Sequence, residues 1–154
     1  MSYSISYTKN EVLQALRYHF IKQTEIKSLM IIVNLYAIVT AVLLFMKKIR
    51  PEPFLLGSVL WIVLMVFFWY ALPNLFYKKT ELFKQQWAFS FNAQQAKLIG
   101  DLGEASWDWE SVTHYFESPE FFHFYFGPKS FFLIPKLTIT QDDQHIIRGI
   151  LKGK

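Results

Sequence analysis

The sequence predicts a membrane-embedded α-helical hairpin joined to a small α+β domain. One observation is a pair of apolar runs without ionisable side chains, Leu29–Met46 and Phe54–Phe76, separated by a short turn. At 1.5 Å per residue these runs form helices of roughly 27 and 35 Å, and the hydrocarbon core of a bilayer is about 30 Å thick. The other observation is the alternation of apolar and polar side chains in short segments of residues 77–154, which is typical of β-strands.

These patterns divide the chain into three parts: an N-terminal segment, residues 1–28; the hairpin, residues 29–76; and the domain, residues 77–154. In the first part, residues 2–8 alternate polar and apolar side chains, which predicts a strand. Thr8 and Glu11 have the spacing of a capping box, in which two side chains satisfy the first amides of a helix. We therefore expect an amphipathic helix that begins near Lys9 and continues into the first apolar run.

The two apolar runs form helices that satisfy their own backbone hydrogen bonds, as any segment that crosses lipid must. Residues 47–53 between them are too few for anything but a turn. Gly57 and Ser58 lie near this turn, and small residues favour close helix packing in lipid. Pro73 predicts either a kink at the end of the second helix or the point at which the chain leaves it.

Asn34 is the one strongly polar side chain in the first apolar run. Its simplest interpretation is a hydrogen bond to the second helix or to a nearby backbone carbonyl; a contact in a pore or with a partner helix is the alternative. Neither run contains Asp, Glu, Lys, Arg or His, which a transporter or a proton relay normally needs. We therefore expect an anchor rather than a transport path.

Basic residues concentrate at the outer ends of the predicted hairpin. The outer flanks hold Arg17, Lys22, Lys27, Lys78, Lys79 and Lys84, and the turn holds Lys47, Lys48 and Arg50. Because cytoplasmic segments carry an excess of Lys and Arg, this distribution places both ends of the chain in the cytoplasm. The formal net charge of +4 fits a membrane-facing surface. Nucleic-acid binding is not expected, since the basic residues do not cluster outside these flanks.

The pattern of apolar and polar side chains in residues 77–154 predicts a meander of about five strands closed by a C-terminal helix. The predicted elements are a strand at 83–91, a turn at 92–95, a strand at 96–99, a turn at 100–103, a strand with Trp107 and Trp109 on one face, a break at 118–120, strands at 121–126 and 131–134, and a helix after the capping pair Thr140 and Asp143. The helix covers one face of a small antiparallel sheet or partly open barrel. The N-terminal strand can join this sheet, because the hairpin returns both flanks to the same side.

Three stretches of the domain carry a family resemblance: Trp107–Val112, Phe121–Phe126 and Phe131–Lys136. Together with the two preceding helices, they resemble the YcxB-like family of bacterial membrane proteins. The resemblance implies two transmembrane helices in the bacterial inner membrane and a C-terminal domain similar to pleckstrin-homology (PH) folds. It supplies no catalytic residue. After Lys136 this chain continues with Leu137-Thr138-Ile139, where the family usually has a basic or small residue and an aromatic one.

A basic patch is the first candidate contact site. Lys78, Lys79 and Lys84 form this patch, and Lys129 and Lys136 extend it. Such a patch is either an ordinary cytoplasmic flank of a membrane protein or a site for anionic lipid head groups.

An aromatic face is the second candidate. In the predicted strand 121–126, Phe122, Phe124 and Phe126 point inward, and Phe121, His123 and Tyr125 share the other face. If this face is exposed, it is a docking surface for a protein or for the bilayer. If the terminal helix or the N-terminal strand covers it, it belongs to the core, which is the simpler interpretation.

The sequence offers no catalytic constellation. It contains no cysteine, which excludes disulfides, thiol catalysis and cysteine-bound metals. His114, His123 and His145 lack the spacing of a metal site, and Asp142 and Asp143 suit a helix N-terminus. A nucleophilic triad and a glycine-rich phosphate loop are also lacking. We expect no enzyme activity, no cofactor and no metal.

We therefore expect a non-catalytic, multi-pass protein of the bacterial inner membrane whose cytoplasmic PH-like domain docks or senses a membrane partner. One alternative is a module that binds anionic membrane lipid through Lys78, Lys79, Lys84 and Lys136. Another is an immunity protein that neutralises a membrane-acting toxin. The expected partners are thus membrane lipid and a membrane protein or toxin, and a homo-oligomer stays open.

Overall fold

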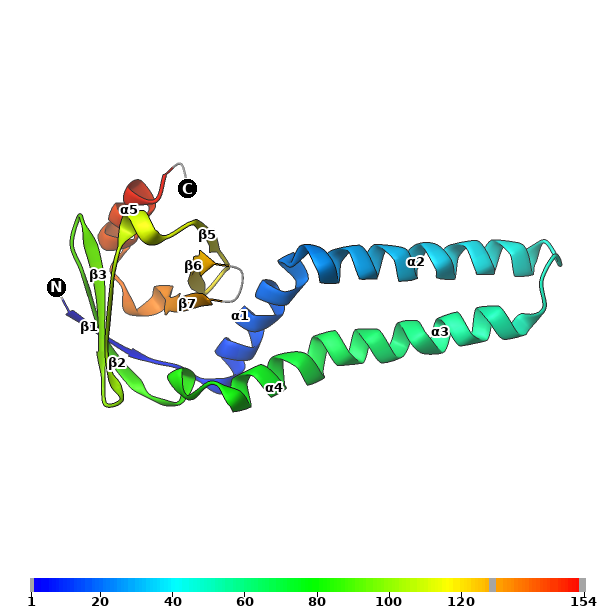
Figure 1. Ribbon diagram of the computed structural model, residues 1–154, viewed down its shortest axis with the longest axis horizontal. Coiled ribbons are helices and arrows are strands. Elements are labelled where there is room, and N and C mark those ends of the chain that lie inside the picture. Colours follow the sequence, from blue (N-terminus) through cyan, green and yellow to red (C-terminus); the bar gives the residue numbers. More distant parts are fainter. Residues whose placement is uncertain (1, 128–129, 153–154) are drawn as a thin grey trace. The chain divides into compact units, whose positions relative to one another are not determined.

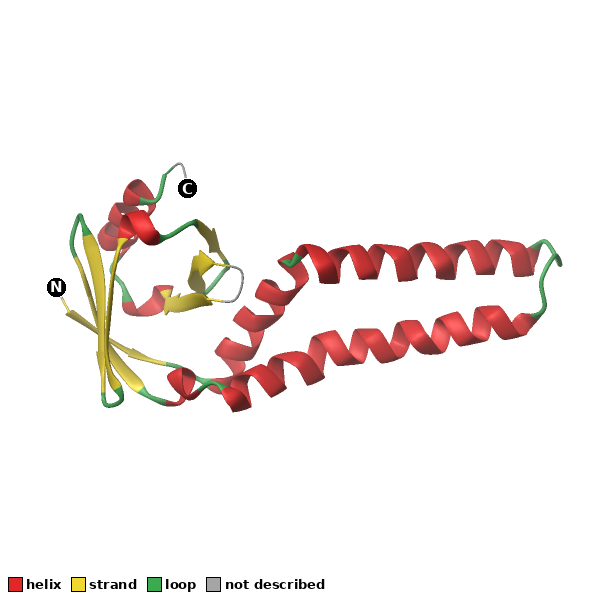
Figure 2. Ribbon diagram, viewed as in Figure 1, coloured by secondary structure: helices red, strands yellow, loops and turns green. Residues whose placement is uncertain are grey.

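The computed structural model describes residues 2–127 and 130–152 (Figures 1 and 2). The chain divides into two compact units. We call the unit formed by residues 1–15 and 80–154 the β unit, and the unit formed by residues 16–79 the hairpin unit. Each unit is described by itself.

The β unit contains two antiparallel sheets and a helix. The first sheet has four strands in sequence order: β1 (Ser2–Ser6), β2 (Gln86–Phe91), β3 (Gln95–Gly100) and β4 (Gly103–Asp108). The second has three: β5 (His114–Glu117), β6 (Phe121–Gly127) and β7 (Ser130–Pro135). Helix α5 (Gln141–Ile150) follows β7 after a short 3₁₀ turn. The predicted α+β class with antiparallel strands and a C-terminal helix is confirmed.

Strand β1 joins the first sheet, although the hairpin separates it from β2 in the sequence. Its register places Tyr3 opposite Phe89 and Ile5 opposite Trp87. The Ile5 side chain is fully buried, as the alternation predicts. The N-terminal strand is therefore part of the domain, and the two segments that flank the hairpin in sequence pair with one another.

The core of the β unit consists of inward-facing side chains from both sheets and from α5. Phe89, Leu98, Phe122, Phe124 and Ile147 are all 0% exposed. Phe122 and Phe124 are the alternate positions of β6 that the sequence predicts to point inward. Burial of side chains of this size is the main source of stability in a small domain.

Three local predictions in the β unit are wrong. The strand predicted from residue 83 begins at Gln86, because Glu81–Lys84 forms a 3₁₀ turn that buries Phe83. Trp109 leaves strand β4 for a second 3₁₀ turn, where its indole Nε1 donates to the Asn92 carbonyl at 2.8 Å. The sequence pattern predicts no strand at His114–Glu117, where β5 forms.

The hairpin unit is a sequence of helical segments. After α1 (Lys9–Lys22), whose last residues belong to this unit, come α2 (Thr24–Phe45), α3 (Pro51–Val66), the π-helical turn η1 (Phe67–Ala71) and α4 (Leu72–Lys79). Gln23 between α1 and α2 has extended backbone angles, φ −63° and ψ 130°, so the predicted continuation of the first helix into the apolar run is wrong at this residue. Helices α2 and α3 run antiparallel and pack against each other (Figure 1).

Two helical segments of the described residues are long and apolar enough to cross a membrane: Thr24–Phe45 and Pro51–Lys79. Only 11% and 6% of their most apolar windows are buried. Large side chains therefore face outward, with Leu56 70% and Ile32 63% exposed. A core helix of a soluble protein would instead bury most of such a surface.

Gly57 permits the close packing of α2 and α3. A Cβ atom at Gly57 would lie 2.5 Å from Cε1 of Tyr36, so the tyrosine ring occupies the space that any larger residue would need. The Tyr36 hydroxyl donates to the Pro53 carbonyl at 3.2 Å. The small-residue contact predicted near the turn is confirmed at this position.

Asn34 makes both contacts of the simpler interpretation. Its amide nitrogen donates to the Met30 carbonyl one turn earlier, at 2.7 Å. Its amide oxygen accepts a hydrogen bond from Nε1 of Trp61 on the second helix, at 3.1 Å. Asn34 therefore links the two helices within the hairpin unit.

Candidate functional site

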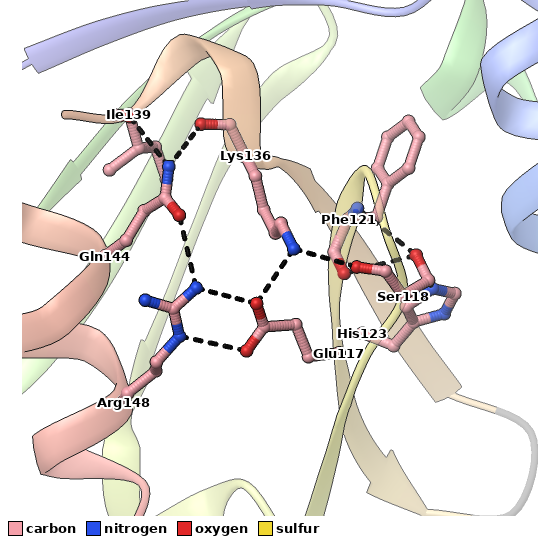
Figure 3. A network of polar contacts seen from close by, with 8 residues as sticks. All are labelled: Glu117, Ser118, Phe121, His123, Lys136, Ile139, Gln144 and Arg148. Atoms are coloured by element: carbon pink, nitrogen blue, oxygen red, sulfur yellow. Dashed lines mark hydrogen bonds and ion pairs between the residues drawn. The ribbon is translucent and has the colours of Figure 1, made fainter. Parts of the chain in front are cut away.

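A charged network lies in the β unit around the carboxylate of Glu117 (Figure 3). Arg148 donates to both carboxylate oxygens, from Nη2 to Oε1 at 2.7 Å and from Nε to Oε2 at 3.0 Å. Lys136 donates from Nζ to Oε1 at 2.8 Å. One carboxylate thus holds two cations, and the bidentate pair with arginine is a strong form of ion pair.

Three separate elements bring these side chains together. Glu117 is the last residue of β5, Lys136 directly follows β7, and Arg148 lies in the last turn of α5. The start of α5 is fixed by Thr140, whose hydroxyl accepts from the Asp143 amide at 3.3 Å, as the capping spacing predicts. Gln144 then donates to the carbonyls of Lys136 and Ile139, at 2.8 and 3.1 Å.

A buried histidine adjoins this network. His123 is 0% exposed, and its Nε2 lies 3.0 Å from the Ser118 hydroxyl. The same hydroxyl accepts from the Phe121 amide at 3.2 Å, while the Ser118 carbonyl accepts from Lys136 Nζ at 3.0 Å. Ser118 therefore connects the turn between β5 and β6 to the ammonium group of Lys136 (Figure 3).

The network keeps Glu117 ionised. The hydrogen bond from Arg148, opposed by partial burial and helped by Lys136, lowers the pKa of Glu117 from 4.5 to about 2. The same bond raises the pKa of Arg148 above its usual value. Counted formally, two basic side chains and one acidic side chain give the network one net positive charge.

An open pocket of about 490 Å³ lies beside the network. Lys136, Arg148 and Gln144 contribute to its lining, together with Glu120. Leu137, also in the lining, is 85% exposed. The pocket therefore combines hydrogen-bonding and charged groups with an exposed apolar side chain. This combination suits recognition of a polypeptide segment better than chemistry on a small molecule.

The predicted basic residues are distributed over both units. Lys78 and Lys79 end α4 in the hairpin unit, whereas Lys84 and Lys136 belong to the β unit. Lys84 pairs with Glu81 at 2.7 Å, and Lys136 pairs with Glu117. Lys129 lies outside the described residues.

The predicted aromatic face is mostly covered. Phe121 is 2% and His123 0% exposed, and Tyr125 is half-buried. Burial raises the pKa of the Tyr125 hydroxyl to about 12. The structure therefore favours the core interpretation of this face, and His123 contributes to the polar network through Ser118 rather than to a surface.

Sequence reasoning missed Glu117, Gln144 and Arg148. Gln144 and Arg148 are one turn apart on the helix that Thr140 caps, so their shared face could have been noticed. Glu117 stands alone after an aromatic segment, and a single acidic residue there is a weak signal. Among residues 2–127 and 130–152, no cluster of three or more His, Asp or Glu side chains could hold a metal ion.

Comparisons with models of protein families, with curated proteins and with solved structures find no match to this chain. The resemblance to the YcxB-like family therefore stays a prediction. Two features of the chain itself bear on its function: an outward-facing apolar hairpin, and a β unit that carries a charged network beside an open pocket.

Proposed function

We propose that this chain is a non-catalytic integral membrane protein whose β unit, similar to a PH fold and to the YcxB-like family, docks or senses a membrane partner. The pocket beside the Glu117 network, with Leu137 85% exposed at its lining, carries the docking part of this proposal. The outward apolar surface of the hairpin supports the membrane part.

The membrane part follows from the solvent that such helices need. Ile38 and Val59 are 60% and 59% exposed, on different helices of the hairpin. Apolar surface of this extent is unfavourable in water and favourable in lipid. The basic residues at the outer flanks favour insertion with both ends of the chain in the cytoplasm of a bacterial cell.

The docking part follows from how the pocket is built. Lys136 and Arg148 are fixed by Glu117, so their hydrogen-bond donors are held in place before a partner arrives. Preorganised side chains lose less entropy on binding than mobile ones. Leu137 adds an apolar contact beside them, which is the usual composition of a protein interface with a polar rim.

The lipid-binding alternative has less support. Lys84 and Lys136 each pair with a glutamate, which offsets the charge that a lipid head group would recognise. The immunity alternative differs from the main proposal only in the identity of the partner. A membrane-acting toxin would be one outcome of the experiment that follows.

Site-specific crosslinking tests the docking proposal in the full-length protein in its native membrane. A photoreactive residue replaces Leu137, and in a matched control it replaces Leu102, which is also strongly exposed, at 68%, in the β3–β4 turn. We expect a defined protein crosslink at position 137, absent at 102 and lost when Arg148→Ala is added. Equal crosslinks at both positions, or crosslinks to lipid alone, would contradict the proposal.

Cysteine accessibility tests the membrane part, because the chain contains no cysteine of its own. Single variants Lys48→Cys in the hairpin turn and Lys152→Cys near the C-terminus replace exposed residues. In spheroplasts, in which the inner membrane is intact, an impermeant thiol reagent should label Cys at 48 and leave Cys at 152 unlabelled. Labelling of both or neither would contradict the proposed topology.

A further inference from the structure

The hairpin unit contains an apolar pocket of about 310 Å³ that the proposed docking function does not use. Met30 of α2, Met65 of α3 and Phe68 and Trp69 of η1 are among its lining residues. Lys27, in the first turn of α2, is an exposed basic residue in the same lining. The volume lies at the lower end of the range of small-molecule sites.

Two residues shape the π-helical wall of this pocket, Pro73 in α4 and Arg17 in α1. Pro73 has no amide hydrogen, so the Trp69 carbonyl loses the donor that an α-helix would give it four residues later. The Nε of Arg17 donates to this carbonyl instead, at 3.0 Å. The π-helical turn η1 precedes Pro73, and the helix continues through Pro73 in α4 to Lys79. Pro73 therefore does not mark the point at which the chain leaves the helix.

Arg17 also holds the aromatic side chains of this wall. Its guanidinium carbon lies 5.2 Å from the Trp69 ring centroid and 5.6 Å from that of Tyr70. These distances are within the range of cation–π contacts. The wall is therefore fixed in position by a hydrogen bond and two ring contacts, and π-helical turns of this kind occur frequently at functional sites.

The other polar group of the pocket is already satisfied. Asn34 uses its amide nitrogen on the Met30 carbonyl and its amide oxygen on Trp61. The interior therefore presents methionine, phenylalanine and tryptophan surface, while charge enters only through Lys27 at the first turn of α2. An occupant that fits both features has an apolar chain and an anionic head.

We propose that this pocket binds one anionic membrane phospholipid, with an acyl chain against Met30, Met65 and Phe68 and the phosphate on the Lys27 ammonium. The proposal rests on the membrane placement of the hairpin proposed above. Lys27 and Trp69 are of the residue types that lie at the interface between hydrocarbon and head groups. A lysine near the cytoplasmic surface of a bilayer attracts anionic head groups, and here Lys27 stands beside the apolar interior.

Native mass spectrometry of the full-length protein in mild detergent tests the charge contact. Phosphatidylglycerol is added as the anionic probe and phosphatidylcholine as the zwitterionic one. We expect one retained phosphatidylglycerol and weaker retention of phosphatidylcholine. Lys27→Gln should weaken phosphatidylglycerol binding about fivefold, the effect of one lysine near an anionic group, and Lys48→Gln in the turn should not. Equal retention of both lipids, or equal effects of the two variants, overturns the proposal.

A second pair of variants tests the apolar part. Met65→Trp places a large ring in the pocket, whereas Val66→Trp introduces the same side chain at a neighbouring position, 53% exposed, outside the pocket lining. We expect Met65→Trp to abolish lipid retention and Val66→Trp to preserve it; the reverse, or no difference, overturns the site. All variants should stay in the membrane fraction after alkaline extraction. A wild-type protein released by that treatment would contradict the membrane proposal, while an inserted protein that retains no lipid would contradict the site alone.

Discussion

The two units of this chain use large apolar side chains in opposite ways. In the β unit, Phe122, Phe124 and Ile134 are 0% exposed and form a shared core. In the hairpin unit, Leu56 and Ile32 are 70% and 63% exposed. One physical rule explains both observations: the removal of apolar surface from water is favourable. In the β unit this surface packs into a core, and in the hairpin unit its composition suits contact with lipid.

Polar groups follow the same division. In the hairpin unit the Thr40 hydroxyl donates to the Tyr36 carbonyl of its own helix, at 2.9 Å, and Asn34 bonds within the helix pair. In the β unit, by contrast, the contacts of Glu117 are ion pairs between charged groups. Neutral polar groups cost less to remove from water than charged ones, so the hydrogen bonds of Thr40 and Asn34 suit an apolar surrounding better than an ion pair would.

The largest expected effect comes from truncating a core phenylalanine. Phe124→Ala should destabilise the β unit by about 3–5 kcal/mol, because it removes a fully buried side chain and leaves a cavity. Leu56→Ala in the hairpin should cost far less, since that side chain is 70% exposed and the proposed membrane placement surrounds it with lipid rather than protein. Thermal unfolding in bilayer nanodiscs, followed by near-ultraviolet circular dichroism, measures both. Comparable destabilisation by the two variants would mean that Leu56 packs against protein.

The elements with local signals were predictable from the sequence. The alternation of β6 gave the inward positions Phe122 and Phe124, and Thr140 gave the start of α5. Strand β5 has no such alternation; it forms because its residues pair with β6, His114 opposite Tyr125. The path of the helix past Pro73 depends on Arg17, which is distant in sequence, so no local pattern could show it.

The candidate site was less predictable than the fold, for the same reason. Of its charged residues only Lys136 was named from the sequence, as part of a basic patch. Glu117 and Arg148 lie 31 residues apart and meet because the fold brings the end of β5 close to the last turn of α5. Neither residue has a distinctive neighbour in sequence, so an ion pair of this kind becomes visible only after the fold is known.

Burial should also set the strength of an ion pair. Glu117→Gln removes the charge that holds Lys136 and Arg148, whose side chains are 18% and 31% exposed. We expect a loss of roughly 1.5–3 kcal/mol, typical of hydrogen bonds to charged groups. Urea unfolding of the full-length protein at pH 7, with an unchanged m-value, checks this loss.

The same carboxylate predicts a pH dependence. Since the pKa of Glu117 is about 2 in the folded β unit and 4.5 ordinarily, its contribution to stability is complete above about pH 4.5 and is lost as the pH falls towards 2. Stability of the wild type should therefore fall more steeply than that of Glu117→Gln over this interval. Parallel pH profiles for the two proteins would show that the ion pair does not form.

Two glycines, one in each unit, face an aromatic ring. A Cβ at Gly57 would lie 2.5 Å from the Tyr36 ring, and a Cβ at Gly100 would lie 2.5 Å from the Trp87 ring. We expect Gly57→Ala to weaken the packing of α2 against α3 and Gly100→Ala to lower the free energy of unfolding of the β unit, each by about 1–2 kcal/mol. The Tyr36 or Trp87 ring has to move in each case. Hydrogen exchange should localise each effect to its own unit, and an effect spread over both units would contradict this assignment.

The smallest effect is expected at a salt bridge on the surface. Lys97 and Glu104 pair at 2.8 Å across β3 and β4, but their side chains are 40% and 65% exposed. Glu104→Gln should therefore cost about 0.5 kcal/mol or less, and added salt should remove even that difference. The pair matches Lys136–Glu117 in distance and differs in burial. If the two Glu→Gln variants lose equal stability in the same urea experiment, burial does not set the strength of these ion pairs. Burial would then decide the energetic contribution of apolar side chains but not that of charged ones.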